Sequence, residues 1–414
     1  MAQLPGKILY LGHQWPEPEA SAAGHRTLQI LEVFRQMGAR VHMGSTAERG
    51  PLSAPLETLE IRCHTFELNS ETFNRHLRQE QYDAVCFDRF ITEEQFGWRV
   101  RDTLPGALLL LDTQDLHSLR YSRAAALGAG REWEVSDLLE EPAFYREMAS
   151  LLRTDLNFLV SRAEVALLRE ILPLLSDSLL YLPMGFKDAR TVDNPGFESR
   201  KDLVFVGNGL HAPNRDAVKW LVQMFAPLLA ETLPKAQLHI CGAYLPEKWK
   251  KGMDATSHIQ IHGHVPDIES VFRKTRLQVA PLRFGAGVKG KILQALSCGL
   301  PTLTTPVGAE GLFSGEGAHI CPGYDAREFV SRCASLYQDQ NQWKQALDTQ
   351  LAETREHFRE PSFWARVLAG WWEGAGVQHQ GREAGILRAL LRYKAFDSHR
   401  YLSRWIAEKN RKPR

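Results

Sequence analysis

Two lysines beside a glycine-rich turn are the residues best placed to do chemistry. The turn FGAGVKGK at residues 284–291 contains Lys289 and Lys291 and runs into an apolar stretch typical of a short helix. Glycines let a ligand approach the backbone closely, and the start of a helix offers unpaired N–H groups and a partial positive charge. With two ammonium groups beside them, those donors suit a phosphate group. The alternative is an ordinary strand-to-helix turn whose lysines are only solvated.

An acidic residue follows the same helix one strand later. We expect the helix to close at Gly299, a strand to occupy residues 302–305, and a second glycine loop to carry Glu310. The carboxylate of Glu310 can accept hydrogen bonds from the hydroxyls of a sugar or a ribose. The alternative is a solvated loop glutamate.

Alternating strands and helices must position these groups. Short apolar runs predict strands in the first part of the chain at residues 7–12, 40–43, 84–87, 107–111 and 158–160, with a helix over 24–38. The pattern restarts with predicted strands at 203–206, 238–241, 259–261, 277–280 and 301–305, and helices over 216–229 and 268–274. Such runs are typical of parallel sheets covered by helices on both faces, which bind ligands at the carboxyl ends of their strands.

The composition is that of a globular protein and excludes several classes. With 414 residues, 44% hydrophobic and 24% charged, the chain has room for two or three domains. Its net charge of +1 gives no reason to expect a nucleic-acid partner. Neither a signal peptide nor an apolar run long enough to cross a bilayer is visible, which predicts a cytoplasmic protein. The six cysteines are scattered without metal-like spacing and predict buried free thiols.

Polar and basic segments mark the expected domain boundaries. Residues 187–201 are polar and aperiodic, which predicts a linker between a domain at 1–190 and another at 200–360. Residues 361–414 are expected to form C-terminal helices that cross back toward the first domain. Their last part, 380–414, is basic and carries apolar residues at helical spacing. Such a tail can lie on an anionic membrane, or it can pack as a peripheral helix on its own protein.

Three segments of the second domain, and two of the first, resemble the group 1 glycosyltransferases, the retaining, family-4-type enzymes of the GT-B fold. The segment VFVGNGLHAPNRDAVKWL (204–221) is similar to the strand, glycine turn and helix that open their nucleotide-sugar-binding domain. The segment GHVPDIESVF (263–272) stands where those enzymes cradle the base, and GLPTLTTPVGAEGL (299–312) resembles their G-x-P-V-V-x-T-x-x-G-x-E stretch. In the first domain, DLNFLVSRAEVALL (155–168) and YLPMGF (181–186) are similar to the segments before the interdomain linker. The resemblance implies an α/β fold of two Rossmann-like doubly wound domains that face a central cleft, plus a C-terminal helical tail.

The resemblance also implies donor-binding residues by their positions. The turn at Gly287 would bind the donor diphosphate through backbone N–H groups and a cation, and the loop after the strand at 203–206 would face the nucleotide. The implied donor-side residues are Gly207, Asn208, Val265, Gly287, Val288, Lys289, Lys291 and Gln294.

Three further residues are implied on the side of the transferred sugar. His117, after a first-domain strand, matches a histidine that the family places near the sugar; the alternative is a capping or buried histidine. Glu310 matches the family's acidic residue after the second glycine loop. Gly24 would let the first loop approach the sugar phosphate; the alternative is a helix entry that needs small residues. His117, Lys289 and Glu310 are therefore the predicted catalytic residues.

The sequence departs from the family at one pair of positions. Many relatives carry two glutamates separated by seven residues across this turn and helix, whereas this chain has Ala286 and Gln294 there. A glutamine can still bond a ribose hydroxyl, but without a charge. The predicted binding of the donor diphosphate therefore depends on the backbone and on Lys289 and Lys291.

These observations predict a hexosyltransferase that moves a sugar from a nucleoside-diphosphate-sugar to a hydroxyl of a glycan, surface polysaccharide or lipid-linked acceptor. No Asp-x-Asp pair stands at a strand end in a convincing context, so we expect metal-independent transfer without a cofactor, and the resemblance implies retention of configuration. The alternatives are a nucleotide-sugar 2-epimerase and a non-catalytic nucleotide-sugar-binding partner. A nicotinamide dehydrogenase is disfavoured because the first turn is not G-x-G-x-x-G. Contact of residues 380–414 with the inner face of the membrane is the predicted alternative to their packing on the protein.

Overall fold

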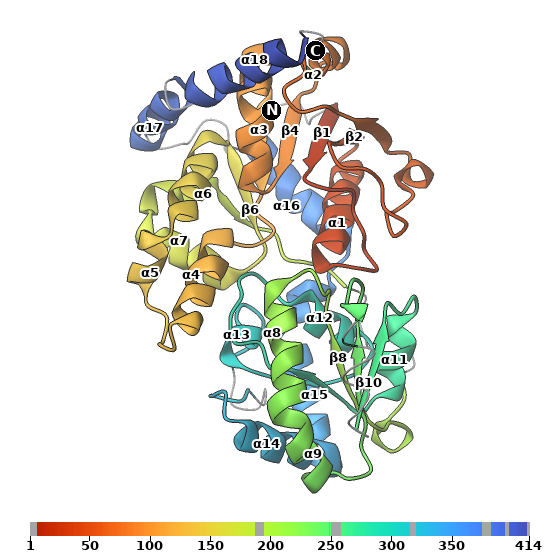
Figure 1. The fold of residues 1–414 in the computed structure, drawn as a ribbon. Coiled ribbons are helices and arrows are strands. Elements are labelled where there is room, and N and C mark those ends of the chain that lie inside the picture. Colours follow the sequence, from red (N-terminus) through yellow and green to blue (C-terminus); the bar gives the residue numbers. More distant parts are fainter. Residues whose placement is uncertain are drawn as a thin grey trace.

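The computed structural model describes residues 6–186, 194–247, 249, 258–314, 320–374, 382–393 and 397–411. Two parallel sheets organise these residues, one in an N-terminal half (residues up to 186) and one in a C-terminal half (residues 194–360) (Figure 1). The α/β fold predicted from the sequence, a GT-B arrangement with C-terminal helices, is confirmed.

The N-terminal sheet has the strand order β3-β2-β1-β4-β5-β6-β7, and every neighbouring pair is parallel. Its strands are β1 (Lys7–Gly12), β2 (Arg40–Ser45), β3 (Arg62–Thr65), β4 (Ala84–Asp88), β5 (Leu108–Asp112), β6 (Leu156–Leu159) and β7 (Leu179–Tyr181). The helices of this half are α1 (Ala22–Gln36), α2 (Glu71–Glu80), α3 (Arg89–Thr103), α4 (His117–Gly128), α5 (Val135–Glu140), α6 (Pro142–Arg153) and α7 (Arg162–Ile171). The strand order reverses between β1 and β4, which is where such sheets form ligand sites.

The C-terminal sheet has the strand order β10-β9-β8-β11-β12, again parallel throughout. Its strands are β8 (Leu203–Val206), β9 (Leu238–Cys241), β10 (Ile259–Gly263), β11 (Leu277–Ala280) and β12 (Thr302–Thr304). The helices of this half are α8 (Ala212–Trp220), α9 (Ala226–Thr232), α11 (Ile268–Lys274), α12 (Gly290–Ser297), α13 (Pro306–Ala309), α14 (Ala326–Gln338) and α15 (Gln340–Glu353). The single helix predicted over 216–229 is interrupted by a π-helical turn at Leu221–Phe225, which ends two residues before Pro227. A proline has no N–H for the α-helical ladder, and the wider turn accommodates that loss.

The end of the chain returns to the N-terminal half. The helix α16 (Pro361–Gly374) buries Trp364, Leu368 and Trp372 in the same apolar cluster as Ile30 and Phe34 of α1. The helix α17 (Arg382–Tyr393) packs on α6, and α18 (Asp397–Arg411) follows it along this half (Figure 1).

The predicted linker, 187–201, lies in part outside the described residues, because 187–193 are not described. Its last part is packed against the C-terminal half. The guanidinium of Arg200 is buried and donates to the carbonyl oxygens of Phe272, Thr275 and Cys298 at 2.6–3.1 Å. All six cysteines are free, and all except Cys63 are buried, as the sequence predicted.

Candidate active site

The glycine turn predicted to bind phosphate is buried where the two halves meet. Gly287 has a φ of +65°, and a Cβ added to it would lie 2.9 Å from Cβ of Asp115 in the N-terminal half. The N–H of Gly287 donates to Oε1 of Glu164 on α7, at 2.8 Å. A side chain at this position would therefore push the halves apart, so glycine here serves the contact between the halves.

The ammonium groups of Lys289 and Lys291 lie at the start of α12. Lys289 is the N-cap residue and is 7% exposed, and its Nζ donates to the carbonyl oxygen of Gly287 at 2.6 Å. Burial lowers the pKa of Lys289, and this effect outweighs the charge of Glu310, which would raise the pKa. Lys291 donates to Oδ1 of Asn214, and burial followed by the charge of Lys289 lowers its pKa to about 7. An anion at this helix start would favour the charged form of both side chains.

Several helix starts converge around these lysines. An added Cβ at Gly290 would lie 2.8 Å from Cβ of Ala22, so α12 and α1 begin side by side. His211, the N-cap residue of α8, is close enough to the charges of Arg120 and Lys291 to be affected by them. Burial, followed by the charge of Arg120, lowers the pKa of His211 to about 3, so this imidazole is neutral. Helix starts carry partial positive charge, and their convergence creates a positive potential in one place.

Glu310 is held by an arginine from the other half. Its two carboxylate oxygens each accept a hydrogen bond from Arg123 of α4 at 2.7 Å, and Arg123 also donates to the carbonyl oxygen of Gly285 at 2.9 Å. Burial would raise the pKa of Glu310, but Arg123 outweighs it and leaves the pKa below its usual value. Arg123 therefore connects α4 to both glycine loops of the C-terminal half, and Glu310 is not the solvated glutamate of the alternative interpretation.

Glu164 is a further carboxyl group at this contact. Its Oε1 accepts hydrogen bonds from the N–H groups of Leu116 and Gly287, at 3.0 and 2.8 Å. Burial, with the charge of Asp115 adding to it, raises the pKa of Glu164 to about 8, so the group is protonated near neutral pH. Glu164 is not among the site residues predicted from the sequence. It stands next to Val165 on the buried face of α7, and a glutamate at an inward helical position is the signal that could have identified it.

His117 is the first residue of α4, directly after β5. Its backbone N–H donates to Oε1 of Glu147 at 2.9 Å, and its ring Nε2 lies 3.2 Å from Oδ1 of Asp115. The ring Nδ1 is buried and has no hydrogen-bond partner among the described residues. The contact of Nε2 with Asp115 thus orients the imidazole, while Nδ1 makes no hydrogen bond to the described residues.

The remaining predicted residues form two groups. Asn208 joins the halves, because its Nδ2 donates to the carbonyl oxygen of Ala20 at 3.1 Å. Gly207 allows close packing, since an added Cβ would lie 2.7 Å from Cγ of Asn214. The N–H of Gly24 donates to Oγ of Ser21, and an added Cβ would lie 2.5 Å from the backbone of Glu17. This geometry favours the helix-entry alternative for Gly24.

Three predicted donor residues have apolar or partly buried settings. Val288 is buried in an apolar cluster with Ile292 of α12. Val265 packs against a neighbouring apolar cluster, as does Val206, which directly precedes Gly207. Gln294 is half-buried on α12, one turn after Lys291.

The packing around Ala286 explains why this chain has alanine where many relatives have the first of two glutamates. Its side chain is 8% exposed and packs into the apolar cluster of the N-terminal half, with Leu116 and Leu119. A glutamate there would place a carboxylate in this apolar contact, next to the carboxyl group of Glu164. Burying an unpaired charge there would cost several kcal/mol, so alanine at 286 fits this packing.

Sequence comparison finds one family that is similar to part of the chain. The family described as group 1 glycosyl transferases matches residues 200–339, which contain the glycine turn and both lysines. A search of curated proteins finds no match.

Solved structures share the fold of most of the chain at low sequence identity. HepE of Anabaena, in complex with UDP, matches with a TM-score of 0.65 and 14% identity over 89% of this chain and 100% of that one. Sucrose-phosphate synthase of Thermosynechococcus elongatus matches with a TM-score of 0.63 and 16% identity over 88% and 98%. WaaG, a glycosyltransferase involved in lipopolysaccharide biosynthesis, gives 0.60 and 13% over 89% and 100%.

Proposed function

We propose that this chain, whose residues 200–339 belong to the group 1 glycosyltransferases, transfers a hexose from a nucleoside-diphosphate-sugar to an acceptor hydroxyl. The observation that carries the proposal is the pair Lys289 and Lys291, at a buried helix start between the two halves. HepE has also been solved with UDP-glucose, which supports a UDP-hexose as the first donor to test.

The donor diphosphate would lie at the start of α12. The first N–H groups of that helix have no partner within it, and Lys289 and Lys291 would add two cations. As the bond to the sugar breaks, negative charge grows on the diphosphate, and preorganised donors in a site shielded from water stabilise that charge. The chain's own cations therefore supply the stabilisation, which supports metal-independent transfer.

The sugar would face α4, and the nucleoside would face the loop after β8. His117 offers Nδ1 for a sugar hydroxyl, and Glu310 has further lone pairs besides those that Arg123 uses. Gly207, Asn208 and Val265 would contact the nucleoside. Retention of the sugar's configuration is proposed on the family resemblance.

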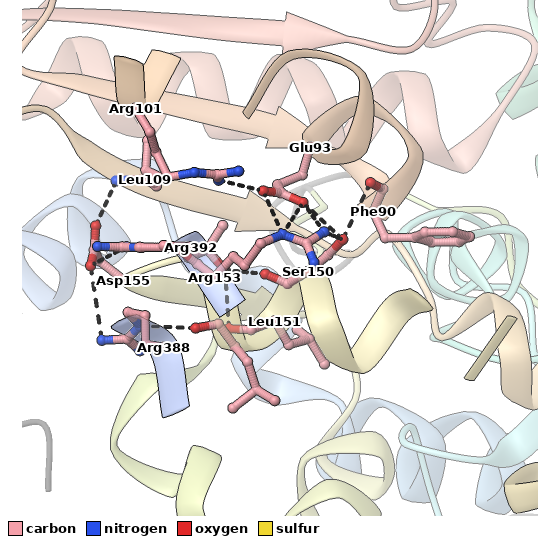
Figure 2. A network of polar contacts seen from close by, with 12 residues as sticks. Phe90, Glu93, Arg101, Leu109, Ser150, Leu151, Arg153, Asp155, Arg388 and Arg392 are labelled. Carbon is pink, nitrogen blue, oxygen red and sulfur yellow. Dashed lines mark hydrogen bonds and ion pairs between the residues drawn. The ribbon is translucent and has the colours of Figure 1, made fainter. Parts of the chain in front are cut away.

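We also propose that residues 380–414 bring the enzyme to the inner face of an anionic membrane, where a lipid-linked or glycan acceptor would be reached. One side of these helices is anchored: Arg388 and Arg392 approach Asp155 on the N-terminal half, at 3.9 and 2.9 Å (Figure 2). The other side exposes more than half of each of the large side chains Ile386, Leu390, Tyr401, Leu402 and Trp405. The segment holds ten lysines and arginines and three acidic residues, and such a surface binds anionic lipid.

No helix among the described residues has the length and apolar character needed to span a bilayer. The proposed membrane contact is therefore tested by sedimentation with vesicles, with and without anionic lipid. Trp405→Ser should reduce binding to anionic vesicles, whereas Tyr145→Ser, at an equally exposed aromatic side chain on α6, should not. Equal binding by both variants would refute the membrane role of the tail.

The transfer reaction is tested in two steps. A thermal-shift panel of nucleotide sugars identifies the donor, because a bound donor stabilises the folded protein by mass action. Incubation of that donor with and without acceptors, followed by proton NMR of the first-formed product, then separates the alternatives. A glycoside of retained configuration supports the proposal. An altered donor sugar without acceptor indicates a 2-epimerase, and binding without any turnover indicates a non-catalytic partner.

A further inference from the structure

Three histidines from separate elements converge on one face of the N-terminal sheet. His42 lies on β2, His64 on the edge strand β3, and His76 on α2, with its ring centroid 4.3 Å from that of His64. One imidazole nitrogen of each lies within 4.8 Å of those of the other two. The predicted donor residues lie elsewhere, at the contact between the halves.

The distance between the nitrogens of His42 and His64 suits a tetrahedral metal ion. The His64 Nε2 and His42 Nδ1 atoms are 3.3 Å apart, which is long for a hydrogen bond between nitrogens. In a tetrahedral zinc site, metal–nitrogen bonds of about 2.0–2.1 Å place neighbouring ligand nitrogens about 3.3 Å apart. The hydroxyl of Tyr82 completes the group, 2.8 Å from His42 Nδ1 and 2.7 Å from His76 Nε2. One nitrogen of each histidine and the hydroxyl of Tyr82 thus lie close together.

The geometry points to a zinc site formed by His42, His64 and His76, with Tyr82 or water at the fourth position. Imidazole nitrogens are preferred ligands of Zn²⁺ in proteins. Bound zinc connects the edge strand β3 to α2 and so stabilises this side of the N-terminal sheet. The site is structural, and it does not take part in sugar transfer.

The alternative is a metal-free hydrogen-bond network centred on Tyr82. The two can be distinguished with tag-free, full-length protein that has been stripped with a chelator. Zn²⁺ is titrated by calorimetry, Co²⁺ binding is followed by the visible absorption of tetrahedral cobalt, and thermal unfolding is recorded with and without Zn²⁺. The variants are His76→Ala and His64→Gln, of which the second alters a partly exposed residue. His262→Ala is the matched control, because it removes one imidazole from the His239–His262 pair, whose nitrogens are 2.9 Å apart.

The zinc site predicts saturable binding of one equivalent, a tetrahedral cobalt spectrum and an unfolding temperature that rises with zinc concentration. Both cluster variants should weaken binding by more than the 10–100-fold that loss of an outer-shell partner costs, whereas His262→Ala should bind as the wild type does. Lack of one-equivalent binding by the wild type, or unchanged affinity in His64→Gln, would overturn the inference. Donor binding is measured in the same samples and should be unaffected, so the outcome is independent of the proposed transferase activity.

Discussion

Replacing Arg123 by alanine should disable the site while leaving each half folded. Arg123 makes two parallel hydrogen bonds to Glu310 and one to the carbonyl oxygen of Gly285, so it joins α4 to both glycine loops. The side chains of Arg123 and Glu310 are only 13% and 22% exposed. Without Arg123, the carboxylate of Glu310 would be left partly buried beside Lys289 without its main partner.

The magnitude follows from these contacts. Breaking a buried ion pair by removing one partner costs about 3–5 kcal/mol, and a hydrogen bond to a charged group contributes about 1.5–3 kcal/mol. Because both side chains keep some contact with solvent, we expect about 2–4 kcal/mol for the loss of Arg123. Because Arg123 holds the two halves together at the proposed donor site, kcat/KM for the donor should fall by about 30- to 1,000-fold.

The assay is donor turnover under kcat/KM conditions, with thermal unfolding in parallel. Arg131→Ala is the matched control, because Arg131 pairs with Asp137 close by but is 53% exposed, and exposed pairs contribute little to stability. Arg123→Lys should recover only part of the activity, since lysine cannot bond both oxygens in parallel. Near-wild-type turnover by Arg123→Ala would refute a role for this contact in the active arrangement.

Three further predictions concern stability, geometry and pH. Glu93→Gln should lower the free energy of unfolding by about 3–5 kcal/mol in urea titrations, because it removes the buried partner of Arg153. Burial opposes ionisation of Glu93, but the charge of Arg153 outweighs this effect and lowers the pKa of Glu93. The stability that Glu93 contributes is therefore fully present above the pKa of an unfolded glutamate. It is lost as the pH falls from that value through the lower pKa of the folded protein. Gly287→Ala should weaken donor binding in calorimetry, because its Cβ would meet Asp115 and its φ of +65° is unfavourable for alanine; unchanged affinity would contradict this. Donor affinity should fall as the pH rises above about 7, by up to about tenfold per unit, as Lys291 loses its charge, and the slope should be shallower in Lys291→Met.

The sequence predicted the architecture because the strands are continuous apolar runs. The predicted strands at 7–12 and 203–206, for example, are observed as β1 and β8 with the same bounds. The short edge strand β3, Arg62–Thr65, was not predicted. It has four residues, three of them polar, and its strand conformation depends on pairing with β2.

The surroundings of the predicted site residues could not be read from the sequence. Local motifs identified the glycine turn and its lysines, because glycine and charge at a helix start have a local physical meaning. Contacts between the halves carry no such signal: Arg123 is one of many arginines, and nothing near it in the chain indicates its bond to Glu310. The burial of Ala286 likewise depends on packing between segments far apart in sequence.

The central claim is that Lys289 helps to hold the donor diphosphate at the start of α12. Calorimetry tests it most directly, with the nucleoside diphosphate that stabilises the wild type most, applied to the wild type and to Lys289→Met. A hydrogen bond to a charged group contributes about 1.5–3 kcal/mol, so the variant should bind roughly 10- to 150-fold more weakly while its unfolding temperature is retained. Equal affinity in the two proteins would contradict the claim.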